Sequence, residues 1–272
     1  MKRHPLVLFF VLAFLLPWLV WATSIAEAAH VIGWHVPQSL AFWLGLTIAT
    51  YVSAAVTGGR RAVLDLLLRM ILVRVNWRWY LAALLVTPVL AVIAGGVGSL
   101  IGEPPALADA SAVSVLLLLL FNVWMWLITE ETAWRGFALP RLQRRFNPLT
   151  ASLVLGVLWA AWHIPLFLIP GTFQSAIPFA GFAISTIATS VLIGWVFNQA
   201  CGSVLLAAIF HGVTDVTIAV CGVMSDGLGL FWTFVVVQVL AAASVSPTLA
   251  RMPRAAVSTP EFHPVRAPSR LA

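Results

Sequence analysis

The chain has 272 residues, of which 61% are hydrophobic and only 9% charged, whereas an ordinary soluble domain has about 45–50% apolar and ~25% charged residues. This composition, with a mean hydropathy of +1.01, excludes a soluble globular enzyme. Few charges and two cysteines also exclude a disordered or disulfide-stapled chain. The formal charge of +6 would point to nucleic acid in a soluble protein, but the positions of the charges argue for a membrane, so we expect no nucleic-acid partner.

Continuous apolar runs predict an all-α, polytopic bundle of about eight transmembrane helices, with residues 1–272 as one membrane domain. Each span needs about 20 apolar residues, and the runs do not alternate as barrel strands would. Residues 5–26 also fit a cleavable signal peptide, but the length of their apolar run favours a retained helix. The spans are expected near residues 5–26, 37–57, 79–101, 112–139, 148–170, 176–197, 202–222 and 228–249.

The charges predict the orientation of these spans. If the N-terminus is cytoplasmic, all 15 Lys and Arg side chains fall in inside segments, as the positive-inside rule requires. The outside connections then carry only the acidic residues Glu27, Glu103, Asp109 and Asp226. We therefore expect both termini in the cytoplasm, and the preference for arginine over lysine favours a bacterial plasma membrane.

Two basic segments are expected to lie outside the spans. Gly58 and Gly59 precede residues 60–79, where charges recur at four-residue spacing beside apolar residues, which predicts an interfacial helix. Residues 250–272 contain four arginines and four prolines and are predicted to form a disordered basic cytoplasmic tail near anionic lipid.

Ionisable residues inside a bilayer are costly and therefore mark candidate functional sites. In the fourth span, a helix continuing to Pro140 would place Glu130 ~15 Å below the cytoplasmic surface. Adjacent helical residues point ~100° apart, so Glu130 and Glu131 are expected to have different roles. Glu131 and Arg135 are four residues apart and are predicted to pair, which leaves Glu130 for chemistry. The alternative is that both glutamates lie at a helix end among lipid headgroups.

The fifth span places His163 ~22 Å from its cytoplasmic end. Trp159 lies one turn earlier and is expected to form a wall of any pocket, and Pro165 is expected to kink the helix just beyond His163. Taken alone, His163 also fits an ordinary hydrogen-bonded histidine of a helix bundle.

The seventh span places His211 ~13 Å deep. Asp215 is four residues further on, where a carboxylate can fix the tautomer of the imidazole. Gly212 permits the close approach of another backbone. The alternative is a His–Asp pair that only holds helices together.

Three helices can bring Glu130, His163 and His211 together at middle depth. Glu and two His are ligand types of catalytic zinc, and the same groups can activate water without a metal. The predicted reaction is hydrolysis. No cofactor is certain from the residues, but a divalent metal such as zinc would be held by these three side chains.

Residues 112–222, the expected catalytic core helices, resemble the CPBP intramembrane proteases, also called Abi proteins, which include the type II CAAX prenyl endopeptidases. That family has Glu-Glu-x-x-x-Arg, Phe-x-x-x-His and His-x-x-x-Asn or His-x-x-x-Asp on successive late helices. The matching residues are Glu130, Glu131 and Arg135, then Trp159 and His163, then His211 and Asp215.

The resemblance implies a membrane endopeptidase, often labelled a metalloprotease, in which Glu130 activates water with help from His163. The matches at His211 and Asp215 would support the oxyanion. Trp159 replaces the usual Phe, which is expected to change only the shape of the pocket. An ionised Asp215 cannot donate a hydrogen bond. Either Asp215 is protonated when it supports the oxyanion, or His211 supports the oxyanion instead.

The expected partner is a membrane-associated or lipidated peptide or protein, together with the lipid bilayer. Two other functions stay open. In a proton-coupled transporter the same residues would form a relay, although all the buried chemistry lies in one half of the chain, unlike a transporter with two matching halves. In a non-catalytic scaffold or immunity protein the polar cluster would only hold helices together.

Overall fold

The protein is all-helical in a computed structural model that describes residues 4–223 and 228–254. Within these residues, seven helices are long and apolar enough to cross a membrane. An eighth apolar helix has 17 residues, near the lower limit for a span. The predicted polytopic helical bundle is therefore confirmed, and the chain is a multi-pass membrane protein.

The helices follow the predicted spans closely at most boundaries. Two π-helical segments and two 3-10 turns join the α-helices. The α-helices are α1 (Pro5–Ala28), α2 (Thr47–Met70), α3 (Trp77–Leu100), α4 (Ala112–Ile128), α5 (Leu139–Gln143), α6 (Pro148–Trp162), α7 (Phe179–Gln199), α8 (Val204–Val220) and α9 (Leu228–Arg251). The π-helical segments are η1 (Ala41–Leu46) and η2 (Thr132–Ala138), and the 3-10 turns are η3 (Ile164–Leu168) and η4 (Gln174–Ala176).

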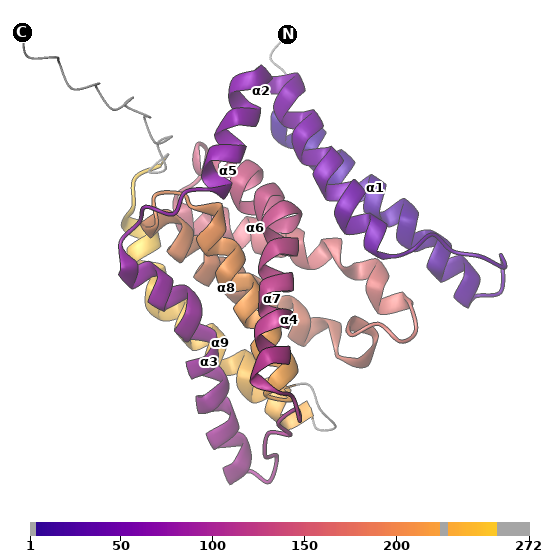
Figure 1. The fold of residues 1–272 in the computed structure, drawn as a ribbon, viewed down its shortest axis with the longest axis vertical. Helices are drawn as coiled ribbons and strands as arrows, with labels where there is room; N and C mark the ends of the chain where they lie inside the picture. Colours follow the sequence, from indigo (N-terminus) through magenta and orange to yellow (C-terminus); the bar gives the residue numbers. More distant parts are fainter. Residues whose placement is uncertain (1–3, 224–227, 255–272) are drawn as a thin grey trace, which may run out of the picture.

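The second half of the chain forms the centre of the bundle. Helix α7 packs against α6 and α9, and α8 packs against α3 and α4. Helix α1 lies at one side, against η1 and α2, and the start of α1 and the end of α9 are at the same end of the molecule (Figure 1). Helices α4, α6 and α8 thereby face one another around a common interior.

Capping residues fix where these three helices begin. Ser111 accepts a hydrogen bond from the backbone N–H of Ser114 at the start of α4, and Ser203 does the same for Leu206 at the start of α8. Asn147 caps α6, in which Pro148 is the first residue. A side-chain oxygen at this position satisfies one of the otherwise unpaired N–H groups of the first turn.

The structure corrects three expected boundaries. Helix α2 is interrupted at Gly59 (φ 64°, ψ −159°), as expected, but the following helical segment ends at Met70 instead of continuing to residue 79. The α-helical part of the fifth span ends at Trp162, followed by the 3-10 turn η3, because Pro165 has no N–H to continue the helix. The expected fourth span, 112–139, is not one continuous helix: α4 ends at Ile128.

Other expectations are not decided by the fold. Asp226 and most of the expected basic tail, residues 255–272, lie outside the described residues. The location of residues 60–70 at the membrane interface and the cytoplasmic placement of both termini stay predictions.

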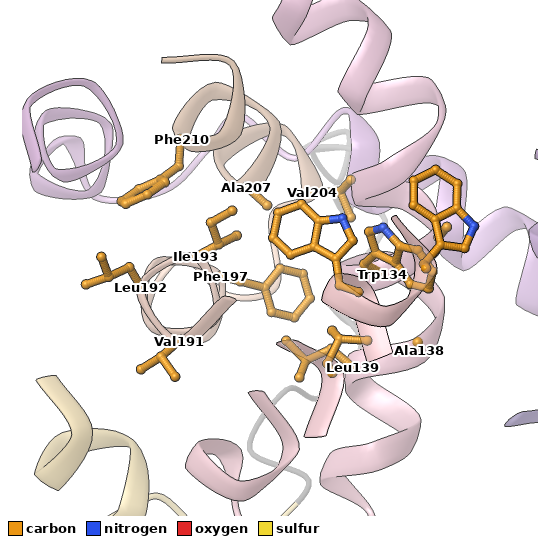
Figure 2. Close-up of a cluster of buried hydrophobic side chains, with 14 of the residues drawn as sticks. Trp134, Ala138, Leu139, Val191, Leu192, Ile193, Phe197, Val204, Ala207 and Phe210 are labelled. Carbon is orange, nitrogen blue, oxygen red and sulfur yellow. The ribbon is translucent and has the colours of Figure 1, made fainter. Parts of the chain in front are cut away.

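A hydrophobic cluster fixes the segment that follows α4. Trp134 of η2 is fully buried and lies among side chains from α7 and α8 (Figure 2). Figure 2 labels the cluster as Trp134, Ala138, Leu139, Val191, Leu192, Ile193, Phe197, Val204, Ala207 and Phe210. Because protein interiors are closely packed, this cluster leaves η2 little freedom to move relative to α7 and α8.

Candidate active site

A cavity of about 560 Å³ lies between the central helices. Five residues singled out from the sequence line it: Glu130, Trp159, His163, His211 and Asp215. Helices α6 and α8 and the segment after α4 supply these side chains, as the predicted convergence requires. The remaining wall is apolar and aromatic, with hydroxyl groups from α7.

The interruption after α4 places the two glutamates. Thr129 has φ −102° and ψ −88°, which is not helical, and the next turns are π-helical from Thr132 to Ala138. The Thr132 hydroxyl donates to the carbonyl oxygen of Leu127, five residues earlier. Side-chain hydrogen bonds of this kind compete with helix formation, and π-helical turns often occur at functional sites.

Glu130 is held by two indole groups. The Nε1–H groups of Trp159 and Trp134 both donate to its Oε2, at 2.6 Å and 3.1 Å. Glu130 is only 1% exposed, yet it lines the cavity. The expectation that Trp159 alters only the shape of the pocket is therefore wrong, because its N–H group contacts the candidate catalytic carboxylate directly.

Glu131 lies behind the wall of the cavity, fully buried. Its Oε1 accepts from Arg135 Nη1 at 2.8 Å, so the ion pair expected from four-residue spacing is formed. The same oxygen lies 2.9 Å from Nδ1 of His211, a contact that spacing along the chain did not predict. The two glutamates thus have different surroundings, as expected from their different directions.

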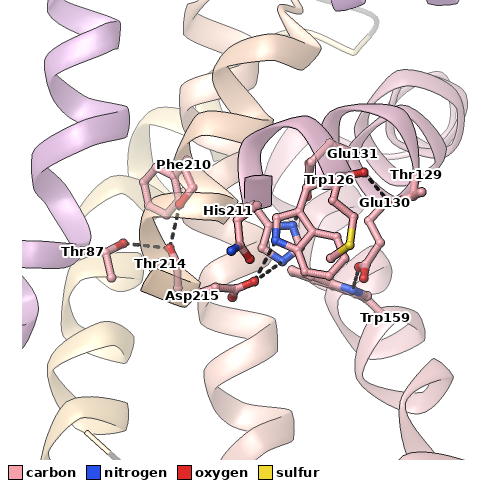
Figure 3. A network of polar contacts seen from close by, with 12 residues as sticks. Thr87, Trp126, Thr129, Glu130, Glu131, Trp159, Phe210, His211, Thr214 and Asp215 are labelled. Atoms are coloured by element: carbon pink, nitrogen blue, oxygen red, sulfur yellow. Dashed lines mark hydrogen bonds and ion pairs between the residues drawn. The ribbon is translucent and has the colours of Figure 1, made fainter. Parts of the chain in front are cut away.

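The carboxylate that fixes the tautomer of His211 is Glu131. A carboxylate oxygen only accepts, so Nδ1 of His211 carries a proton. Asp215, expected in this role, lies 3.8 Å away from Nε2 of His211, which is too long for a hydrogen bond. Instead, Asp215 Oδ2 accepts from the Trp126 indole at 2.7 Å, and the Trp126 ring is stacked on His211 at 4.7 Å between centroids (Figure 3).

His163 directly follows α6 and is fixed by the backbone of that helix. Its Nδ1 lies 2.8 Å from the carbonyl oxygen of Trp159, which can only accept, so Nδ1 carries a proton, and the neutral form of the ring has its lone pair on Nε2. The ring packs edge-on against Phe182 of α7. His163 is therefore oriented as a neutral hydrogen-bond acceptor at the wall of the cavity.

The three predicted zinc ligands are not gathered around one point in this arrangement. Among residues 4–223 and 228–254, no group of three or more His, Cys, Asp or Glu side chains is placed to hold one ion. Nδ1 of His163 and Nδ1 of His211 are each held by a protein oxygen, so a metal could be bound only through Nε2 of each ring. The zinc ligation expected of Glu130, His163 and His211 stays a prediction.

Sequence reasoning missed two tryptophans of the site. Trp126 and Trp134 lie four residues before and four residues after Glu130, a spacing that places side chains on one face of a helix. That spacing was the available signal for Trp134, which does contact Glu130. Trp126 contacts Asp215 of α8, which no spacing within α4 indicates.

The segment from α4 to α8 also matches known proteins. Residues 112–217 match the family model described as type II CAAX prenyl endopeptidase Rce1-like. The predicted resemblance is confirmed. All the site residues from Trp126 to Asp215 lie inside this Rce1-like segment.

A curated protein of Methanococcus maripaludis, named CAAX prenyl protease 2, is similar to the same part of the chain. It is 30% identical over 120 residues, an alignment that covers 42% of this chain and 43% of the curated protein. The alignment thus spans less than half the length of either protein. The Rce1-like segment supplies most of the cavity lining, and the other lining residues are Phe42, Ala106, Ile218, Ala219 and Gly222.

Proposed function

We propose that the protein is an intramembrane endopeptidase that hydrolyses a peptide bond in a membrane-associated or lipidated protein. The observation that carries the proposal is the environment of Glu130. One carboxylate oxygen is fixed by two indole N–H groups, and the residue borders a cavity shared with His163 and His211. A fixed carboxylate beside imidazoles in a water-poor site is suited to activating water.

The reaction would begin with a water molecule between Glu130 and His163. The free Nε2 lone pair of His163 would orient the water. Glu130 would take a proton from the water while the water oxygen attacks the carbonyl carbon of the peptide. Glu130 would then give that proton to the leaving amine. General acid–base catalysis of this kind contributes roughly 10²–10⁴-fold.

The tetrahedral intermediate would need a donor for its oxyanion. His211 supports this role, because Nδ1–H is bound to Glu131 and, in the imidazolium form, Nε2–H is the ring's remaining donor. Asp215 and Glu131 flank the two nitrogens, so an imidazolium formed there would have a carboxylate near each nitrogen. In the structure, Asp215 accepts from Trp126, which supports assigning the oxyanion contact to His211 instead of Asp215.

The proposed substrate class follows from the surroundings of the cavity and from the name of the relative. The cavity lies inside a helical bundle that crosses the membrane, so a substrate must be delivered at or in the bilayer. The curated relative is named for prenylated CAAX proteins, and such a lipidated chain end is one member of the proposed class.

The proposal is tested with purified protein in lipid nanodiscs. The wild type and Glu130→Gln are incubated with a membrane peptide library that includes a farnesylated CAAX peptide and its unmodified twin, and products are read by mass spectrometry. Glu103→Gln, a change of the same kind outside the cavity lining, is the matched control.

We expect cleavage by the wild type and by Glu103→Gln, with a loss of about 10²-fold or more in Glu130→Gln. Metal content measured on the same preparations tests the zinc prediction separately. Cleavage that survives in Glu130→Gln, or no cleavage of any peptide by the wild type, would contradict the proposal.

A further inference from the structure

Trp159 contacts three parts of the site through three different groups. Its indole N–H donates to Glu130 Oε2, and its carbonyl oxygen accepts from His163 Nδ1. Its ring lies 4.5 Å from the Cζ atom of Arg135, within the range of a cation–π interaction. A phenylalanine, the usual residue in the resembled motif, would keep the carbonyl and ring contacts but has no N–H group.

The contact with Arg135 fixes the plane of the indole. Arg135 is itself held by Glu131, and both are fully buried. Trp159 is 4% exposed, so its ring has little room to turn away. The ion pair behind the wall thereby restricts the orientation of the Trp159 indole.

Both indole donors bind the same oxygen of Glu130. Trp134 reaches Oε2 from one turn further along the chain, at 3.1 Å, and Trp159 reaches it from α6, at 2.6 Å. Within the part of the chain that the structure describes, no hydrogen bond is made by Oε1. The carboxylate therefore has one oxygen fixed and one oxygen left for a reacting molecule.

We infer that Trp159 is a positioning residue, whose indole N–H, together with that of Trp134, anchors one oxygen of Glu130 so that the other oxygen is presented to the cavity. This inference rests on the proposed function for its kinetic consequence. A hydrogen bond to a charged group is worth enough to change a rate by roughly 10- to 100-fold when it is lost.

The test compares two tryptophan-to-phenylalanine variants. Trp159→Phe removes the N–H group but keeps an aromatic ring over Arg135. Trp21→Phe makes the same reduction in volume at another fully buried tryptophan, outside the cavity lining, whose Nε1 has no hydrogen-bond partner in the described part of the chain. The difference between the variants isolates the N–H contact from the loss of packing.

We expect Trp159→Phe to lower kcat roughly 10- to 100-fold while KM stays within about threefold, and Trp21→Phe to keep the kcat of the wild type. Unchanged kcat in Trp159→Phe, or equal losses in both variants, would overturn the inference. If Trp159→Phe does not fold, β-(3-benzothienyl)alanine at position 159 keeps the bicyclic shape, replaces N–H by sulfur and is judged by the same criteria.

A spectroscopic measurement separates this inference from the proposed function. The infrared difference between the wild type and Glu130→Gln isolates the carboxylate bands of Glu130, and it is repeated in the Trp159→Phe background. A shift of these bands supports anchoring by Trp159 even if no peptide is ever cleaved. Unchanged bands overturn the inference whatever the activity.

Discussion

At the scale of single residues, Glu131 connects Arg135, in the segment after α4, with His211 of α8. One of its oxygens contacts both Arg135 and His211, while its Oε2 and the Nε and Nη2 atoms of Arg135 have no partner among the described residues. A buried ion pair is strongly destabilising to break but costs little to replace as a whole. The pair is therefore expected to act as one energetic unit.

We predict that Glu131→Gln and Arg135→Met each lower the free energy of unfolding by about 3–5 kcal/mol, because each removes the opposite charge from a buried partner. Arg135 is then left without a carboxylate, and Glu131 keeps only its contact with His211. The double variant should lose clearly less stability than the sum of the losses in the two single variants, with a coupling energy of about 0.5–3 kcal/mol. Unfolding in mixed detergent micelles measures these values.

Arg144→Met is the control for the loss of an arginine, since Arg144 is exposed and should change stability by less than about 0.5 kcal/mol. Strict additivity of the two buried changes would show that the pair is not a unit.

Contacts between residues four apart could be predicted from the sequence, whereas contacts between helices could not. The Glu131–Arg135 pair follows from helical geometry and is present. The Glu131–His211 and Trp159–Glu130 contacts join residues 80 and 29 positions apart. They depend on how α6 and α8 pack against the segment after α4, which no spacing in one helix specifies.

At the scale of elements, hydropathy located the helices but not the interruption in the fourth span. The residues Thr129, Glu130, Glu131 and Thr132 are all buried, and their polar groups find partners in other helices or in the preceding turn. A continuous helix would satisfy the backbone equally well, so the local hydroxyl bonds of Thr129 and Thr132 and the contacts with other helices together favour the break. The predicted depth of Glu130 assumed that continuous helix.

The crossing of α4 and α8 depends on Gly212, as its position beside His211 suggested. A Cβ atom there would lie 3.0 Å from the backbone nitrogen of Val123 and 3.3 Å from its Cα atom. Backbone atoms of a packed helix cannot move aside as a flexible side chain can. The two helices, and with them Trp126 and Asp215, would have to separate.

We therefore predict that Gly212→Ala lowers the free energy of unfolding by roughly 1–3 kcal/mol and also lowers kcat, because the Trp126–Asp215 contact spans this crossing. The control is Gly96→Ala in α3, where a Cβ atom would meet nothing within 4 Å. There the better helix propensity of alanine should leave stability unchanged or raise it by up to about 1 kcal/mol. Equal effects at the two glycines would contradict the argument from close approach.

At the scale of the whole molecule, the helices alternate in direction in a way that agrees with the segregation of charge. The turn between α7 and α8 lies at the end of the bundle to which the sequence assigns the basic segments, and the end of α8 lies at the opposite end. The arrangement of the helices does not identify which end of the bundle faces the cytoplasm, so the orientation in the membrane depends on the positive-inside rule alone. The two cysteines happen to mark these two ends.

Cys201 lies in the α7–α8 turn and is exposed, and Cys221 follows α8 and is partly buried. If the N-terminus is cytoplasmic, Cys201 is inside and Cys221 outside. In intact cells, a membrane-impermeant maleimide should label Cys201→Ser, which keeps Cys221, and should label Cys221→Ser only after the membrane is permeabilised.

Burial raises the pKa of the Cys221 thiol, so its reactive thiolate is scarcer at neutral pH and labelling should accelerate as the pH rises. The reaction is therefore run near pH ~8.5, the ordinary pKa of a thiol, with a permeant maleimide to confirm that both thiols react. The reverse pattern would have Cys201 labelled in intact cells and Cys221 protected. It would show that the basic segments lie outside, which would contradict the charge rule from which the topology was predicted.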